Sequence, residues 1–334
     1  MYDFNYYTPT KVIFGRDSVQ QLGALVKAQG CKKVLIHYGG GSVIDSAKAI
    51  GYGAAEDADV WELYEQTRTA RACLPVGVVL TIAASGSEMS MGSVITKDEG
   101  GIKRAYDDDL ARPKFAVMDP ALTMTLPDYQ TASGCVDILM HTMERYFTAG
   151  STMEITDSIA EALMRTVIHS ARILHNTPQN YEARAEVMWA GSLSHNGLTG
   201  CGNDGGDFAS HKLEHELGGM FDVAHGAGLA AIWGSWARYV YDARPDRFRR
   251  FAVNVMGVTD TGSDLELALR GIEAMEAFYR SIGMPTSLEE LGIAPTDQQI
   301  EELAEKCALA CGGVAGSVKK LRQEDMRNIY KMAR

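Results

Sequence analysis

The amino-acid sequence predicts an N-terminal α/β domain with a Rossmann-like sheet, residues 1–126, followed by an all-α metal-binding domain, residues 127–334. Three observations lead to this fold class. The chain has 334 residues, which is enough for two hydrophobic cores. Before Pro127, short β-branched runs alternate with helical patterns, as in an open parallel sheet. After Pro127, apolar residues recur at helical spacing almost throughout.

The predicted elements follow the chain in this order. In the first domain the predicted strands are Lys11–Phe14, Lys33–His37, Val76–Thr81, Ser93–Thr96 and Lys114–Met118. The predicted helices between them are Val19–Lys27 and Ser42–Tyr52. In the second domain the predicted helices are Tyr129–Phe147, Glu154–Leu174, Tyr181–Ser194, Asp207–Met220, Gly226–Tyr241, Asp264–Ser281, Asp297–Ala310 and Glu324–Met332.

The composition excludes several classes of protein. Hydrophobic residues make up 46% of the chain and charged residues 22%, as in ordinary globular proteins. A net charge of −11 would repel nucleic acids and anionic membranes, and no apolar run reaches the length of a membrane span. The N-terminus lacks a signal-peptide pattern, so we expect a cytoplasmic protein. Its cysteines should then be reduced thiols, namely Cys31, Cys73, Cys135, Cys201, Cys307 and Cys311.

Two charged runs could suggest binding sites, but simpler interpretations are favoured. The arginines at 244, 247, 249 and 250 alternate with apolar and acidic residues, which predicts a solvated helix face. The run Asp107–Asp109 precedes Arg112 and Pro113, which predicts a solvated turn.

Five coordinating side chains fall into two short clusters. Asp137 and His141 lie four residues apart on a predicted helix, so one helix face presents both. His211 and His215 are also four apart, and His225 follows ten residues later. Three imidazoles and one carboxylate suit a borderline divalent ion such as Fe²⁺ or Zn²⁺. The spacing leaves open which three of the four histidines would bind it.

Two loops of small residues follow predicted strands. Residues Gly39, Gly40, Gly41 and Ser42 precede a helix, where free backbone N–H groups and the helix N-terminus favour a phosphate. This run does not match G-x-G-x-x-G, and a tight strand-to-helix turn is the alternative interpretation. The second loop is Thr81–Glu88, whose hydroxyls and amides could contact a nucleotide or form a plain turn.

Together these motifs resemble the iron-containing alcohol dehydrogenase family, in particular its butanol dehydrogenase and aldehyde reductase branch. The stretches GGGSVIDSAKAI, TIAASGSE and DPALTMTLP occur in the family's order, followed by Asp-x-x-x-His and His-x-x-x-His-x9-His. The resemblance runs essentially from end to end, with one gap.

The resemblance implies roles that the spacing left open. It implies that Asp137, His141, His211 and His225 bind the metal, whereas His215 lies near the nicotinamide and substrate as a catalytic residue. It also implies contacts with NAD(H) or NADP(H), at Gly39, Gly40, Gly41, Ser42, Asp45, Thr81 and Ser85. Ser85 departs mildly from the family, which usually has threonine there, and Ile82 and Ala84 replace its usual Thr and Gly.

The gap lies at residues 37–48. Members of this branch have two Gly-Gly-Gly-Ser stretches, which here are fused into HYGGGSVIDSAKAIG. Roughly fifty residues are missing between them, which is more than one βαβ unit. In the family that segment carries strands of the nucleotide sheet and the contact that separates NADP from NAD.

The resemblance implies reversible hydride transfer between NAD(P)(H) and short-chain alcohols or aldehydes, in a homo-oligomer, most simply a dimer. Two alternatives remain. The chain could be a metal-binding remnant whose cofactor binding is impaired by the deletion. It could also be a lyase of the dehydroquinate synthase type, although the helices that carry the ligands are not basic enough for a phosphate-bearing substrate.

Overall fold

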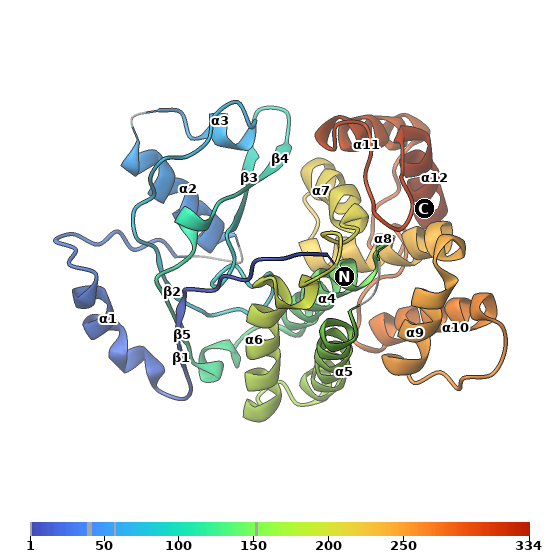
Figure 1. Cartoon of the computed structure of the whole chain (residues 1–334), viewed down its shortest axis with the longest axis horizontal. Coiled ribbons are helices and arrows are strands. Elements are labelled where there is room, and N and C mark those ends of the chain that lie inside the picture. The colour runs from blue at the N-terminus through green and yellow to red at the C-terminus, as the bar shows by residue number, and fades with distance from the viewer. Residues whose placement is uncertain (1, 39–41, 57, 151–152) are drawn as a thin grey trace.

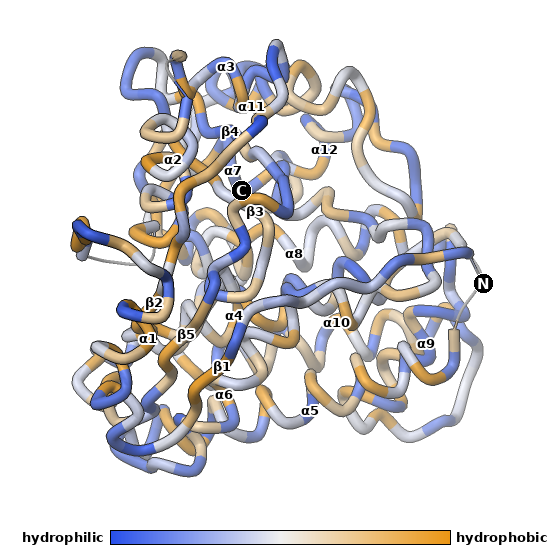
Figure 2. The backbone as a smooth tube through the Cα atoms, turned by 60° about the vertical axis from the view of Figure 1, so that its left-hand side comes forward, coloured by the Kyte–Doolittle hydropathy of each residue, from blue (hydrophilic) through white to orange (hydrophobic). Residues whose placement is uncertain are grey.

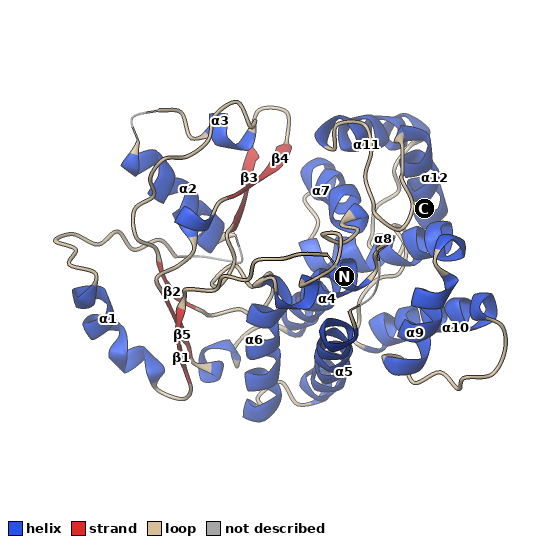
Figure 3. Ribbon diagram, viewed as in Figure 1, coloured by secondary structure: helices blue, strands red, loops and turns tan. Residues whose placement is uncertain are grey.

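A computed structural model describes the chain except for residues 1, 39–41, 57 and 151–152. All of its strands belong to the N-terminal part, whereas the C-terminal part is built from helices (Figures 1 and 3). We propose residues 1–126 and 127–334 as two domains, a division supported by this change at Pro127. The elements of the first part are β1 (Lys11–Phe14), η1 (Ser18–Gln21), α1 (Leu22–Ala28), α2 (Val43–Ala55), α3 (Trp61–Tyr64), β2 (Gly77–Val79), β3 (Gly92–Lys97), β4 (Ile102–Asp107), η2 (Asp109–Ala111), β5 (Phe115–Met118) and η3 (Pro120–Thr123).

Three strands form a parallel sheet in the order β1-β5-β2, with Ile13 and Val79 both opposite Val117. Every residue of the central strand β5 is buried, as expected for a parallel strand that is covered on both faces. On one face Val117 packs with Ile13 of β1 and Leu25 of α1. These parts of the predicted α/β domain are confirmed.

A separate antiparallel pair, β3-β4, was only half predicted, because β4 and the short α3 were missed. The sequence of β4, IKRAYD, carries too many charges to indicate a strand on its own. Its Tyr106 packs edge-on against Tyr52 of α2 and Tyr64 of α3. Tertiary packing of aromatic rings therefore supports this strand where local propensity does not.

The strand predicted at Lys33–His37 is wrong. The described residues between α1 and α2 form no strand, and the chain loops outward there (Figure 1). The side chains of this loop are unusually exposed for apolar residues: Val34 is 58% exposed, Leu35 74%, Ile36 78% and Tyr38 87%. Figure 2 shows the same stretch projecting from the molecule. A strand needs a neighbour, and this segment pairs with none of the described strands.

The C-terminal part packs nine α-helices around one large core within the described residues. The predicted helices are all present with bounds shifted by a few residues, and α9 is additional. They are α4 (Asp128–Tyr146), α5 (Glu154–Asn176), α6 (Tyr181–His195), α7 (Ala209–Phe221), α8 (His225–Val240), α9 (Pro245–Asn254), α10 (Asp264–Ser281), α11 (Asp297–Ala310) and α12 (Gln323–Ala333), with short 3-10 turns η4 (Leu198–Gly200) and η5 (Tyr241–Ala243). Helix α4 is buried on nearly all sides, which places it at the centre of this core.

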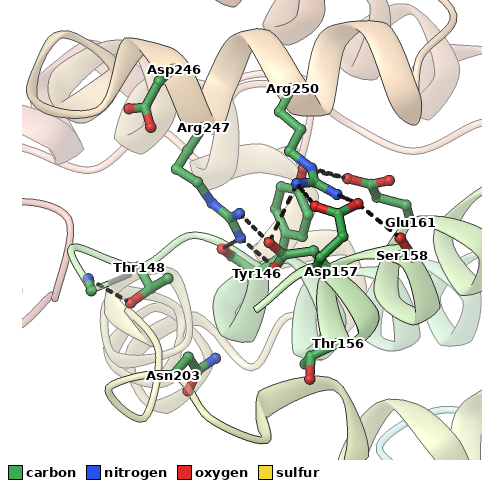
Figure 4. Close-up of polar contacts among 12 residues, drawn as sticks. Tyr146, Thr148, Thr156, Asp157, Ser158, Glu161, Asn203, Asp246, Arg247 and Arg250 are labelled. Atoms are coloured by element: carbon green, nitrogen blue, oxygen red, sulfur yellow. Dashed lines mark hydrogen bonds and ion pairs between the residues drawn. The ribbon is translucent and has the colours of Figure 1, made fainter. Parts of the chain in front are cut away.

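The arginine-rich run forms α9, and its prediction as a solvated face is wrong for one residue. Arg247 is 1% exposed, and its guanidinium forms a two-pronged ion pair with Asp157 at 2.7 and 2.9 Å. It also lies over the ring of Tyr146, 4.0 Å from the ring centroid. Arg250 contacts Glu161 on the same side (Figure 4). The fixed guanidinium fork suits a buried carboxylate, which explains an arginine in this interior position.

The remaining sequence predictions on charge and cysteine hold. Asp108 caps η2 and Asp109 pairs with Arg112 in a turn. All six cysteines are free thiols, of which only Cys31 is exposed. Among the described helices, none is both long and apolar enough to cross a membrane.

Candidate metal and nucleotide site

Three helices bring the predicted metal ligands together. Asp137 and His141 lie on α4, His211 lies on α7, and His225 is the first residue of α8. The start of α8 approaches α4 very closely, since a Cβ atom on Gly226 would overlap the carbonyl oxygen of Ser133. A glycine at this position therefore allows His225 to reach the ligands on α4.

The four side chains converge on one point. The Oδ1 atom of Asp137 lies 3.3 Å from Nε2 of His141, 3.5 Å from Nε2 of His211 and 3.7 Å from Nε2 of His225. Asp137, His141 and His211 are buried, and His225 is partly exposed. Four ligand atoms at these separations could share one small cation.

Two of these ligand atoms lack hydrogen-bond partners, as expected if they bind a cation. Asp137 Oδ1 and His211 Nε2 are buried, yet neither has a hydrogen-bond partner among the described residues. Buried polar atoms are rarely left in this state, because each loses its interaction with water. Three imidazole nitrogens and one carboxylate oxygen are a suitable donor set for Fe²⁺ or Zn²⁺. The residues present therefore fit the metal that the sequence predicts.

Two carboxylates contact the predicted ligand histidines from behind, and the sequence analysis missed both. Glu144 contacts Nδ1 of His211 and also accepts a hydrogen bond from its backbone N–H, at 2.9 Å. Glu214 contacts Nδ1 of His225. Such partners fix the imidazole tautomer that leaves Nε2 free for a metal. A signal for Glu144 exists, because residues 137, 141 and 144 share one helix face.

Burial and nearby charge shift the pKa of His211 in opposite directions. Burial alone would lower this pKa, but Glu144 and Asp137 raise it to about 9. The negative potential that favours a proton here would equally favour a divalent cation.

His215 lies beside this cluster and not in it. Its ring centroid is 6.2 Å from that of His211 and 5.8 Å from that of His225. Asp137, His141 and His211 group without it, and His215 groups instead with Glu214 and His225. Burial, followed by the charge of Lys103, lowers the pKa of His215 well below its usual value. The lowered pKa favours the neutral form of this imidazole, whose ring lies next to two of the predicted metal ligands.

Lys103, another residue that the sequence analysis missed, comes from β4 in the N-terminal part. Its Nζ lies 3.6 Å from Glu214 Oε2. The candidate site is therefore built from both parts of the chain, as expected for a ligand site between domains.

The predicted nucleotide residues differ in their surroundings. Ser42, at the start of α2, and Thr81 are exposed, and Ser85 is half-buried. Gly39, Gly40 and Gly41 lie outside the described residues. Asp45 is different, because its carboxylate accepts hydrogen bonds from Ser87 and from the backbone of Val94. Burial raises the pKa of Asp45 despite these bonds. Asp45 is thus already bonded within its own domain.

Lys48 ties helix α2 to the second candidate nucleotide loop and was not identified from the sequence. This fully buried lysine, on α2, donates hydrogen bonds to Ser87 Oγ at 2.9 Å and to the carbonyl of Gly92 at 2.6 Å. Burial lowers its pKa to about 8. The loop 81–88 also presses on α4, where a Cβ atom on Gly134 would overlap the carbonyl oxygen of Ala83. The loop and the helix that carries Asp137 therefore lie side by side.

A parallel sheet with glycine- and serine-rich loops, set against a helical site of three histidines and an aspartate, has the organisation of a metal-dependent dehydrogenase. Comparison with known proteins agrees. Residues 36–120 match the family model of iron-containing alcohol dehydrogenases, and residues 131–334 match the model of that family's C-terminal part. The chain belongs to the iron-containing alcohol dehydrogenase family, whose members use a divalent metal and NAD(P)(H).

Individual relatives cover nearly the whole chain. A probable NADH-dependent butanol dehydrogenase 1 from Bacillus subtilis is 35% identical, with 99% of each chain covered. The NADPH-dependent aldehyde reductase YqhD from Escherichia coli is 36% identical over 78% of this chain and 67% of its own. The crystal structure of NADH-dependent butanol dehydrogenase A from Thermotoga maritima is 32% identical in sequence and superposes with a TM-score of 0.94. The superposition covers 100% of this chain and 99% of the Thermotoga chain.

These comparisons also bear on the predicted gap. The alignment with the Bacillus protein extends over 389 positions, although this chain has only 334 residues. At least 55 positions of the relative therefore have no counterpart here. Because both chains are covered almost to their ends, most of these positions are internal.

Proposed function

We propose that this chain is a metal-dependent alcohol dehydrogenase or aldehyde reductase that transfers hydride between NAD(P)(H) and short-chain alcohols or aldehydes. The observation that carries the proposal is the convergence of His141, His211 and His225 on Asp137 Oδ1, within 3.3–3.7 Å. The activities for which the Bacillus and Escherichia relatives are named, butanol dehydrogenase and aldehyde reductase, support the substrate class.

In this proposal the four converging residues hold one divalent ion, and the ion supplies a Lewis acid for the substrate oxygen. Glu144 and Glu214 keep two of the ligand imidazoles in the orientation that binding needs. Ser42, Thr81 and Ser85, with the glycines at 39–41, orient the nucleotide. His215 either relays the proton of the alcohol or positions the substrate, and its neutral ring suits both roles.

The direct test is a nicotinamide absorbance assay. Protein loaded with Fe²⁺ or Zn²⁺ should oxidise NADH or NADPH when butyraldehyde is added, and should reduce the oxidised nucleotide when butanol is added. Metal-free protein serves as the control and should be inactive. A metal-loaded protein that binds NADH and yet turns over neither substrate would contradict the proposal. The relatives named above are dehydrogenases and reductases, which favours hydride transfer over the lyase alternative.

A second candidate function is supported by the gap. At least 55 positions are missing relative to the Bacillus protein, and Val34–Ile36, which should form a strand of the nucleotide sheet, lie in solvent. A chain in this state would bind metal but hold a nicotinamide nucleotide weakly. Titration with NADH and NADPH, followed by nucleotide fluorescence, distinguishes the two functions. Tight binding of either nucleotide would reject the remnant hypothesis.

We also propose that the chain forms a homodimer and is cytoplasmic. The dimer is supported by the exposed apolar segment Val34–Tyr38 and by the outer edge of β2, where Gly77 is exposed and no described strand is paired. A second copy could cover both surfaces. The cytoplasmic location is supported by six free cysteines.

A further inference from the structure

The Nδ1 atoms of the three proposed ligand histidines have different hydrogen-bond partners. Nδ1 of His211 faces Glu144, and Nδ1 of His225 faces Glu214. For Nδ1 of His141, the described residues offer no carboxylate partner. This atom lies 3.0 Å from Nδ1 of His195, the last residue of α6, and the two ring centroids are 4.0 Å apart.

Two facing imidazole nitrogens form a hydrogen bond only if one carries a proton and the other does not. The position of Arg145 shows which of the two nitrogens carries the proton. Its Nη2 atom lies 3.2 Å from the same Nδ1 of His195. A guanidinium can only donate, so Nδ1 of His195 must be the acceptor of both bonds. The proton between the two histidines therefore belongs to His141.

The guanidinium itself is firmly placed. Nη1 of Arg145 donates to the carbonyl of His141 at 2.8 Å and to the carbonyl of Ser194 at 3.1 Å. The same side chain lies over the ring of Phe208, 5.0 Å from its centroid. Arg145 thus connects the helix of His141 to the end of α6, and its Nη2 is directed at His195.

We propose that His195 is a positioning residue for the metal site: its unprotonated Nδ1 accepts the Nδ1–H of His141 and so keeps the Nε2 lone pair of His141 directed at the ion. The inference rests on the proposed metal site. In this proposal the Nδ1–H of His141 is accepted by the neutral imidazole of His195, which also contacts the guanidinium of Arg145. His211 and His225 instead face the carboxylates Glu144 and Glu214. The carboxylates that contact the proposed ligand histidines from behind are thus Glu144 and Glu214.

The test compares two substitutions of similar size. His195→Leu removes the acceptor, whereas His195→Asn places an amide oxygen near the former Nδ1. Metal-free proteins would be titrated with Co²⁺ against a chromophoric chelator, and the visible absorption of bound Co²⁺ would report the coordination. We expect His195→Leu to bind Co²⁺ roughly 10- to 100-fold more weakly, as for other losses of a partner behind a metal ligand. His195→Asn should remain within about threefold of the parent, because its acceptor is kept.

Thermal unfolding of the metal-free variants controls for packing, and we expect the leucine and asparagine forms to be folded. If His195→Leu binds Co²⁺ as tightly as the parent, or if both variants weaken equally, the positioning role is wrong. A parent protein that takes up no Co²⁺ would instead overturn the proposed metal site, and the role of His195 with it.

Discussion

The interior of the helical part and the edge of the α/β part differ in how well their side chains are covered and partnered. In the helical part, charged side chains lie in the interior and have partners, as Arg247 does with Asp157 and His211 with Glu144. At the edge of the α/β part, several apolar side chains lie in solvent, and Leu35 and Ile36 are among the most exposed large apolar residues of the described chain. The helical part is thus complete around its site, whereas the nucleotide sheet has an open edge.

The difference shows which part of the family's machinery this chain retains. A metal site needs a few side chains on rigid helices, and α4, α7 and α8 carry the four proposed ligands. A nucleotide site needs a sheet wide enough to support its loops, and the parallel sheet here has three strands among the described residues. We therefore expect the missing positions to affect cofactor binding more than metal binding.

The largest expected effect concerns His215 and sharpens the distinction between ligand and catalytic residue. We expect His215→Ala to keep its metal but to lower kcat by roughly 10²- to 10⁴-fold, the usual contribution of a proton-transfer group. Metal analysis and the butyraldehyde assay would be run on the same sample. His169→Ala, an exposed histidine on α5, is the matched control and should change neither. A His215→Ala protein that purifies without metal would show that His215 is a ligand.

The next effect tests the charged interior of the helical part. Asp157→Ala leaves Arg247 buried without its ion-pair partner, and we expect a loss of about 3–5 kcal/mol in the free energy of unfolding. The control is Asp260→Ala on the neighbouring exposed pair with Arg249, where about 1 kcal/mol or less should be lost. Denaturant unfolding measures both. Equal losses would mean that the buried pair has no special role in this core.

A smaller effect is expected in the α/β part. Lys48→Met removes the hydrogen bonds that tie α2 to the loop 81–88 and leaves Ser87 and Gly92 short of a donor. We expect a loss of about 1–3 kcal/mol in the free energy of unfolding. Lys27→Met, at an exposed position on α1, provides the control. No difference between the two variants would show that the buried lysine is dispensable.

The smallest effect on stability is expected at the open edge. Because Leu35 is 74% exposed, Leu35→Lys should change the free energy of unfolding of a single chain by less than about 0.5 kcal/mol. The same change should weaken the proposed dimer, which light scattering would detect as a fall in molar mass. If Leu35→Lys instead destabilises a chain that stays monomeric, the segment packs inside its own molecule.

Much of the fold and the ligand set could be predicted from the sequence, because local patterns encode them. The pair Asp137 and His141 sits on a helix that is buried on nearly all sides, and its spacing is visible in one turn. Residues that act through distant partners were not predictable in this way. Arg247 is buried because Asp157, ninety positions earlier, faces it, and Lys103 reaches Glu214 from another part of the chain.

At Lys33–His37 the local sequence pattern predicts a strand that the structure does not form. Its sequence has the composition of a strand, and the local prediction was reasonable. A strand is stable only with neighbours, and at least 55 positions that the Bacillus relative has are missing from this chain.

The central claim is that Asp137, His141, His211 and His225 together hold one divalent ion, and metal analysis tests it most directly. The parent, purified and dialysed, should contain about one ion per chain, and His225→Ala should retain far less, because three ligands remain and a coordination position is opened to water. His225→Ala protein that is as fully loaded with metal as the parent would contradict the assignment.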